Sequence, residues 1–251
     1  MELWIYLLIL LVGIFTGFVN TLAGSGSLLT LPLLIFLGLP ANVANGTNRV
    51  SILLQSLISV RGFHSRGLLR TEDSLILALS SSLGAVLGAQ IAVGINEELM
   101  QKTIGAIMLL MLFLMFLNPK RWIEGRNEKK RSRIVEMIIF FLIGIYGGFI
   151  QAGVGIFILS ALILYSGFDI IRANASKVLI VLIYTIPALS VFILNNQVVW
   201  DIGILLAIGG MIGADLGVRF SSRKEAGIWI HRLLILVVLF SALKLLGIFP
   251  V

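Results

Sequence analysis

Hydrophobic residues fill long continuous stretches of this chain, and polar residues are confined to short intervals between them. Ten apolar segments can be read, at 3–22, 27–37, 42–60, 74–95, 99–117, 134–152, 154–166, 173–193, 202–220 and 228–248. A helix needs about 20 apolar residues to cross a bilayer, so 27–37 and 154–166 are too short to cross comfortably. The pattern predicts an all-α integral membrane protein with about eight to ten membrane segments.

The composition excludes water-soluble classes of protein. Of 251 residues, 59% are hydrophobic and 12% are charged, whereas an average soluble domain has about 25% charged residues. After Glu2 the next charged residue is Arg49. A soluble globule needs polar groups on its loops and helix faces, so soluble enzymes, disordered proteins and nucleic-acid binders are excluded. We expect the lipid bilayer as the surroundings and no nucleic-acid partner.

The cysteine content excludes several chemistries, and the first residues of the chain are interpreted as part of a membrane segment. The chain has no cysteine, which excludes disulfides, thiolate metal sites and cysteine nucleophiles. The first residues, Met-Glu-Leu-Trp, lack the basic region of a signal peptide, so they read as the start of the first membrane segment. We expect no metal and no cofactor.

Both short segments follow a glycine-rich interruption, and this coincidence points to an internal duplication. At a constant offset of 129 residues, the interruption at 23–26 falls on that at 152–155. The same register pairs Gly24 with Gly153, Gly26 with Gly155, Gly38 with Gly167, Ala44 with Ala173, Asn45 with Asn174, Thr47 with Ser176, Glu72 with Asp201, Gly84 with Gly213, Ala85 with Ala214 and Gly88 with Gly217. Asn20 and Gln151 also correspond if two residues are gapped. We therefore expect one repeat at 1–117, a linker at 118–133 and a second repeat at 134–251.

The charges of the loops indicate that the two repeats are inverted. The loop at 61–70 carries three arginines, whereas its equivalent at 195–197 carries no positive charge. The loop at 96–98 is acidic, but its equivalent at 219–224 is basic. The linker at 118–133 contains seven Lys or Arg and two Glu, which is typical of a cytoplasmic loop. These biases predict an inverted-topology repeat, a common transporter plan with its site at broken helices near the midplane.

The glycine-rich interruptions are the first candidate binding elements. A helix that restarts inside the membrane offers free N–H groups and the positive end of its dipole, which suit an anion. The alternative is that the small residues only allow close helix packing. The candidate residues in these turns are Asn20, Gly24, Ser25, Gly26, Gln151, Gly153 and Gly155.

The openings of two later helices, near 44–49 and 173–177, are the second candidate elements. Each contributes an amide, a hydroxyl and a cation: Asn45, Thr47, Asn48 and Arg49 in the first copy, and Asn174, Ser176 and Lys177 in the second. Asn and Thr can also be ordinary N-caps, and long cations can reach the headgroups. A cation near a helix N-terminus opposes the dipole, and a bound anion would explain both observations. We expect Arg49→Ala to weaken anion binding and leave the fold intact.

Asp215 is a weaker candidate. A carboxylate inside an apolar segment is a candidate for proton coupling. However, Arg219 follows four residues later, the spacing of an ordinary helical ion pair, which is the interpretation we favour.

A chain with these motifs, in this order and in two copies, resembles the sulfite exporter TauE/SafE family, also called the TSUP family of anion transporters. The resemblance covers nearly the whole chain. It rests on Gly17-Phe18, Gly24-Ser25-Gly26, Pro32, Gly38 and 44–48, on the second copy from Gly148-Phe149 to Ser176, and on the Gly84/Gly88 and Gly213/Gly217 pairs. It implies export or import of small sulfur-containing anions, such as sulfite or sulfoacetate, across a prokaryotic-type cell membrane. The second copy departs from the first, with Ala175 and Lys177 in place of Gly46 and Asn48.

Our hypothesis is a secondary transporter that works by alternating access and holds a small anion at the midplane. An anion channel and a non-transporting accessory protein remain as alternatives. An intramembrane serine protease is disfavoured, because neither histidine lies in a membrane segment where it could serve Ser25 or Ser27. The sequence leaves open which anion is transported, in which direction and with which coupling ion. It also leaves open the oligomeric state, and a homo-oligomer is compatible with it. It also leaves open whether 27–37 and 154–166 cross or re-enter.

Overall fold

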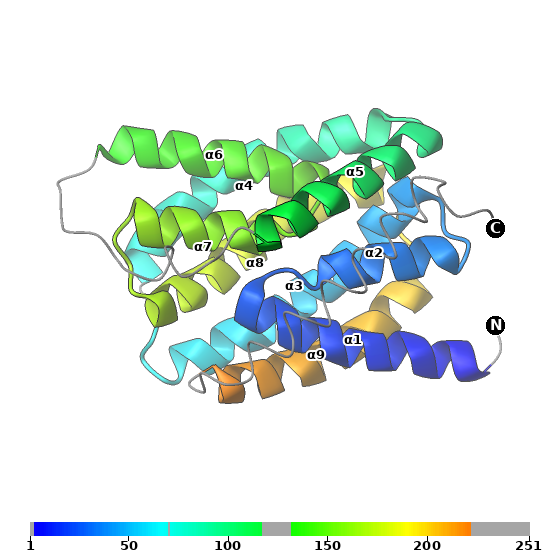
Figure 1. Ribbon diagram of the computed structural model, residues 1–251, viewed down its shortest axis with the longest axis horizontal. Coiled ribbons are helices and arrows are strands. Elements are labelled where there is room, and N and C mark those ends of the chain that lie inside the picture. Colours follow the sequence, from blue (N-terminus) through cyan, green and yellow to red (C-terminus); the bar gives the residue numbers. More distant parts are fainter. Residues whose placement is uncertain (1–2, 70, 117–131, 222–251) are drawn as a thin grey trace.

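The computed structural model describes residues 3–69, 71–116 and 132–221, and these residues form nine α-helices and no strand (Figure 1). The helices are α1 (Leu3–Ala23), α2 (Ser27–Phe36), α3 (Ala41–His64), α4 (Thr71–Gly94), α5 (Glu97–Phe116), α6 (Arg133–Phe149), α7 (Val154–Leu164), α8 (Ile170–Leu194) and α9 (Trp200–Phe220). The all-α class is thus confirmed for the described residues. The expected segment at 228–248 and most of the linker at 118–133 lie outside them.

Four of the described helices, α1, α4, α8 and α9, are long and apolar enough to cross a membrane. Their outer faces are apolar too: Leu79, Leu83 and Leu87 follow one face of α4 and are 51–68% exposed. Exposed leucines in such a row suit contact with lipid. The helix α3 is as long as α4 but less hydrophobic, because its inner face carries a series of buried polar residues.

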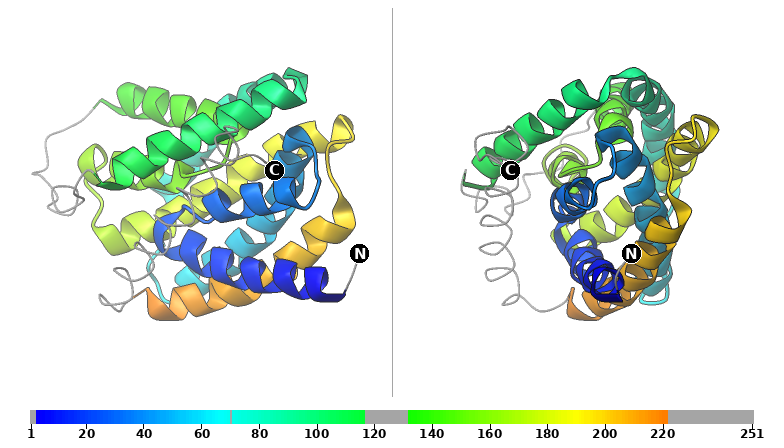
Figure 2. Two further views of the ribbon diagram at one scale, coloured as in Figure 1. Left: turned by 45° about the vertical axis from the view of Figure 1, so that its right-hand side comes forward. Right: turned by 90° about the vertical axis from the view of Figure 1, so that its right-hand side faces the viewer.

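The two halves of the chain interleave in one bundle (Figures 1 and 2). The helix α1 packs along α9, and α6 packs along α4, so each half supplies the partner of the other half's first helix. Glycines allow these contacts: a Cβ on Gly17 would overlap the backbone of Gly210, and a Cβ on Gly148 would overlap that of Ala85. The bounds also follow the expected register, since α8 begins 129 residues after α3, and α9 begins 129 residues after α4.

Each short helix runs back toward the end of the bundle where the preceding long helix begins. Near the end of α7, Tyr165 Oη donates to the carbonyl of Ser132, just before α6, at 3.3 Å, and the Ser166 hydroxyl donates to the carboxylate of Glu136. In the first half, Leu34 near the end of α2 packs with Ile9 of α1. The short helices therefore return instead of continuing in the direction of α1 and α6.

The long helices α3 and α8 run in opposite directions and define two ends of the bundle. The start of α3 meets the end of α8, since a Cβ on Gly46 would overlap the carbonyl of Gln197. At the other end, Phe63 packs with Ala175 and Val218. Five arginines of the described residues gather at this second end: Arg61, Arg66, Arg133, Arg172 and Arg219.

Candidate functional site

The chain leaves the helical conformation after α1 and after α6, at positions that match in the two halves. Gly24 has φ 71° and Gly153 has φ 72°, in the left-handed region that favours glycine. The two turns lie against each other: the Gly155 N–H donates to the carbonyl of Gly24 at 3.3 Å. A Cβ on either Gly24 or Gly155 would overlap the other residue's backbone. Two breaks far apart in sequence thus meet inside the bundle.

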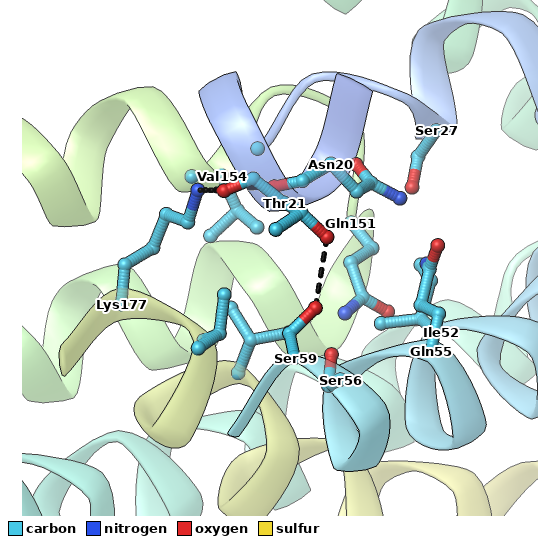
Figure 3. Close-up of a pocket in the computed structure, with 14 residues that line it drawn as sticks. Asn20, Thr21, Ser27, Ile52, Gln55, Ser56, Ser59, Gln151, Val154 and Lys177 are labelled. Carbon is cyan, nitrogen blue, oxygen red and sulfur yellow. Dashed lines mark hydrogen bonds between the residues drawn. The ribbon is translucent and has the colours of Figure 1, made fainter. Parts of the chain in front are cut away.

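A small cavity lies beside this contact (Figure 3). The space open to the centres of water molecules measures about 30 Å³, and one water needs about 10–15 Å³ of it. The cavity therefore holds about two waters or one compact ion. Its polar side chains are Asn20, Thr21, Ser27, Gln55, Ser56, Ser59, Gln151 and Lys177, and its apolar wall comprises Ile52, Val154, Val178 and Val181.

Five of the fourteen residues predicted to bind substrate line the cavity: Asn20, Gly24, Gln151, Gly155 and Lys177. The other nine lie outside the lining: Ser25, Gly26, Asn45, Thr47, Asn48, Arg49, Gly153, Asn174 and Ser176. The glycine-rich turns of both halves thus contribute residues to the cavity wall. Of the helix openings, only Lys177 reaches the cavity wall.

Lys177 closes the end of a helix from the other half. Its ammonium donates to the carbonyls of Asn20 and Thr21 at 3.0 and 3.1 Å, and to Asn174 Oδ1 at 2.6 Å. Asn20 and Thr21 are in the last turn of α1, where carbonyls lack partners within their own helix and the dipole favours a cation. The conflict with the dipole of α8 is resolved because Lys177 lies in its third turn and serves α1 instead.

Arg49 caps the C-terminal end of α6 in the same way. Its guanidinium donates to the carbonyls of Gly147 and Gly148 at 3.1 and 2.5 Å, and to Gln151 Oε1 at 3.5 Å. It also lies 4.7 Å from the centre of the Phe192 ring. Arg49 is fully buried and lies outside the cavity lining. These contacts give Arg49 a structural role, because its removal leaves the end of α6 uncapped. We therefore expect Arg49→Ala to affect the stability of the fold, in addition to any effect on anion binding.

The remaining predicted residues of α3 hold neighbouring segments in place. Asn45 Nδ2 donates to the carbonyl of Phe149 at 2.7 Å, and Thr47 Oγ1 accepts from the N–H of Val199 at 3.0 Å. Asn48 Oδ1 accepts from the hydroxyl of Thr30 at 2.6 Å. In the second half, the buried hydroxyl of Ser176 finds no hydrogen-bond partner within residues 3–69, 71–116 and 132–221.

Lys177 and Arg49 are 1% and 0% exposed, and neither has an acidic partner among the described residues. The salt bridges between described residues all involve other side chains, each at least half exposed except for Arg172, at 49%. Buried charges are costly unless they are paired or hydrogen-bonded. The hydrogen bonds of both cations stabilise them, but the surroundings of the cavity keep a positive charge that an anion would balance.

Asp215 has the partner that its spacing indicates. Its carboxylate lies 2.8 Å from Arg219 on the same helix, with side chains 50% and 66% exposed. It is not among the residues that line the cavity. Among the described lining residues there is neither a carboxylate nor a histidine.

Five polar lining residues were not predicted as substrate ligands: Thr21, Ser27, Gln55, Ser56 and Ser59. Three of them lie on α3, in a series that begins with Asn45, Asn48 and Arg49. Polar residues recur there every three or four positions, which places them on one face of a helix. This stripe of polar residues within an otherwise apolar segment is the sequence feature that could have identified Gln55, Ser56 and Ser59 as lining residues.

Comparison with known proteins gives a consistent picture. The sequence model of the family "Sulfite exporter TauE/SafE" matches residues 9–245. The chain is 28% identical over 231 residues to the probable membrane transporter protein ORF9 of Sinorhizobium sp, covering 92% of this chain and 88% of the relative. It is 25% identical over 226 residues to a probable membrane transporter protein of Haemophilus influenzae, covering 89% of each. It is 27% identical over 214 residues to the probable membrane transporter protein YfcA of Escherichia coli, covering 85% of this chain and 79% of YfcA. No solved structure matches the chain.

Proposed function

Because the chain belongs to the sulfite exporter TauE/SafE family, whose relatives carry the names of membrane transporters, we propose that it is a secondary transporter of a small sulfur-containing anion. Sulfite and small sulfonates such as sulfoacetate are the substrates proposed. The protein would work by alternating access as a multi-pass protein of the prokaryotic cell membrane. Its partners are the substrate and the lipid bilayer.

The observation that carries the proposal is the cavity where the two helix breaks meet. Its wall contains the buried ammonium of Lys177 and a set of amide and hydroxyl groups, and the described lining residues include no carboxylate. Donors of this kind favour an anion over a cation. A buried positive charge without an acidic partner is better tolerated when an anion binds beside it.

The arrangement of the helices supports an inverted repeat, a common plan of transporters that work by alternating access. The helices α3 and α8 run in opposite directions, and α1 on α9 is matched by α6 on α4. The five arginines at one end of the bundle favour that end as the cytoplasmic one. We accordingly propose that α2 and α7 re-enter, and that the whole chain has about eight to ten membrane segments.

Counterflow in proteoliposomes tests the proposal. Vesicles loaded with unlabelled sulfite should accumulate external radiolabelled sulfite transiently, because a carrier exchanges bound substrate in both directions. Lys177→Met should abolish the exchange, while Lys102→Met is the matched control, since Lys102 is exposed and paired with Glu98. Size-exclusion profiles confirm that each variant is folded. Flux without counterflow would indicate a channel, and neither flux nor stabilisation by any anion would indicate an accessory protein.

A further inference from the structure

Most polar side chains that line the cavity are already satisfied by the protein. The ammonium of Lys177 has three acceptors, and the hydroxyls of Thr21 and Ser59 bond to each other at 2.8 Å. Gln151 Nε2 donates to Tyr184 Oη at 3.3 Å and to Thr185 Oγ1 at 3.1 Å, while its Oε1 accepts from Arg49. These groups shape the cavity and contribute its charge.

Two side chains of α3 differ, because they line the cavity without a hydrogen-bond partner in the part of the chain that the structure describes. Gln55 is 3% exposed and Ser56 is 5% exposed, and neither side chain has a hydrogen bond with the described residues. In Gln55 the acceptor Oε1 is fully buried without a partner, so its Nε2 is the group that can donate to an anion. Figure 3 shows Gln55 extending from α3 toward the level of Asn20 and Ser27. Buried polar groups in proteins are nearly always hydrogen-bonded, and an exception calls for a ligand or another specific reason.

A third donor faces the cavity from α1. The N–H of Gly26 donates to Asn20 Oδ1 at 2.6 Å, which fixes the amide and leaves its Nδ2 as a free donor. The cavity therefore has two amide groups and one hydroxyl available, and the ammonium of Lys177 lies on another side of it (Figure 3). Several donors at one small site suit an ion with several acceptor oxygens.

The apolar part of the cavity wall limits the size of the ligand. Ile52, Val154, Val178 and Val181 form an apolar wall, and the open space of about 30 Å³ equals about two waters. A carrier must enclose its substrate between its two open states. A pyramidal oxyanion such as sulfite is about the size of two waters, whereas sulfoacetate adds a carboxymethyl group for which this space has no room.

From these observations we propose that Gln55 and Ser56, with Asn20, determine the specificity of the site, and that Val178 and Val181 restrict it to compact oxyanions. The assignment rests on the proposed function and narrows its substrate class. Gln55 Nε2 and the hydroxyl of Ser56 donate to the oxygens of the ion, and the two valines exclude a substituent on the sulfur.

The first test removes the free donors. In Gln55→Met, the affinity for sulfite, measured by calorimetry on the purified protein, should fall about ten- to a hundredfold, the loss expected for one hydrogen bond to a charged ligand. Ser56→Ala should lower it in the same direction. The matched controls are Gln90→Met and Ser190→Ala, because Gln90 and Ser190 are exposed, and Ser190 bonds to its own helix. Unchanged affinity in Gln55→Met and Ser56→Ala would overturn the assignment of the donors.

The second test enlarges the cavity. Val178→Ala and Val181→Ala should keep sulfite binding and gain binding of methanesulfonate and sulfoacetate, each by at least about tenfold over the wild type. Binding of sulfoacetate by the wild type as tightly as sulfite, or no gain in either variant, would overturn the size restriction. If the wild type binds no oxyanion at all, the proposed function itself fails, which is a different outcome from unchanged selectivity.

Discussion

Lys177 and Arg49 each close the end of a helix that belongs to the opposite half of the chain. The sequence identified both cations, because a charge near the start of an apolar helix conflicts with the dipole. Their partners could not be predicted, since the carbonyls they cap lie 98 to 157 residues away. Gln55 and Ser56 were not predicted for another reason. They belong to the stripe of polar residues on α3, which lies outside the glycine-rich motifs on which the predicted site was based.

Replacement of Arg49 by alanine should act mainly on the stability of the protein, and its effect on the affinity for sulfite should be smaller in free energy. The variant loses the hydrogen bonds to Gly147 and Gly148, so we expect the free energy of unfolding to fall by about 2–4 kcal/mol. Thermal unfolding in detergent measures the change. Arg219→Ala is the control, because its exposed ion pair should contribute less than about 1 kcal/mol. Equal melting points for Arg49→Ala and the wild type would show that the cap of α6 is not needed.

The helix breaks show what an element of this fold requires from its sequence. Long apolar runs predicted the helices well: the segment at 74–95 corresponds to α4, and that at 202–220 to α9. The course of the short helices was not predictable, because length excludes a full crossing but does not fix the direction in which the chain continues. That direction follows from the left-handed glycines and from the contact between the two breaks.

The contact between the breaks should tolerate no side chain. In Gly155→Ala the added Cβ would overlap the backbone of Gly24, so we expect a loss of about 1–3 kcal/mol or more in the free energy of unfolding. Gly94→Ala is the matched control at the end of α4, where a Cβ meets no atom within 4 Å. There we expect no loss, and at most a gain of about 1 kcal/mol from helix propensity. Denaturant or thermal unfolding of both variants gives the comparison, and a stable Gly155→Ala protein would contradict it.

At the scale of the whole molecule, the interleaving of the halves means that neither contains a complete bundle. The helices α1 and α6 find their main partners, α9 and α4, in the other half. A chain divided within the linker at 118–133 should therefore fold only when both pieces are made together. Co-expression of tagged pieces should give a complex that co-purifies, while each piece alone aggregates or is degraded. A stable, monomeric first piece would contradict this expectation.

The absence of cysteine makes the proposed orientation testable with single substitutions. Ser65 follows α3 at the arginine-rich end and Asn196 follows α8 at the opposite end, and both are exposed. In intact cells, a membrane-impermeant maleimide should label Asn196→Cys from outside, whereas Ser65→Cys should react only after the cells are opened. The reason is the positive-inside rule, which keeps the arginines in the cytoplasm. Labelling of both positions from the same side would contradict the inverted arrangement.

The cap on α1 also governs how the protein is made. Lys177 is synthesised 156 residues after Thr21, and a ribosome adds about 5–20 residues per second, so the end of α1 waits about 10–30 s for its cation. Unpaired carbonyls are not tolerated in hydrocarbon. The nascent α1 and α2 must therefore stay beside water or the insertion machinery until α8 arrives, and release of the first half into lipid has to await the synthesis of the second.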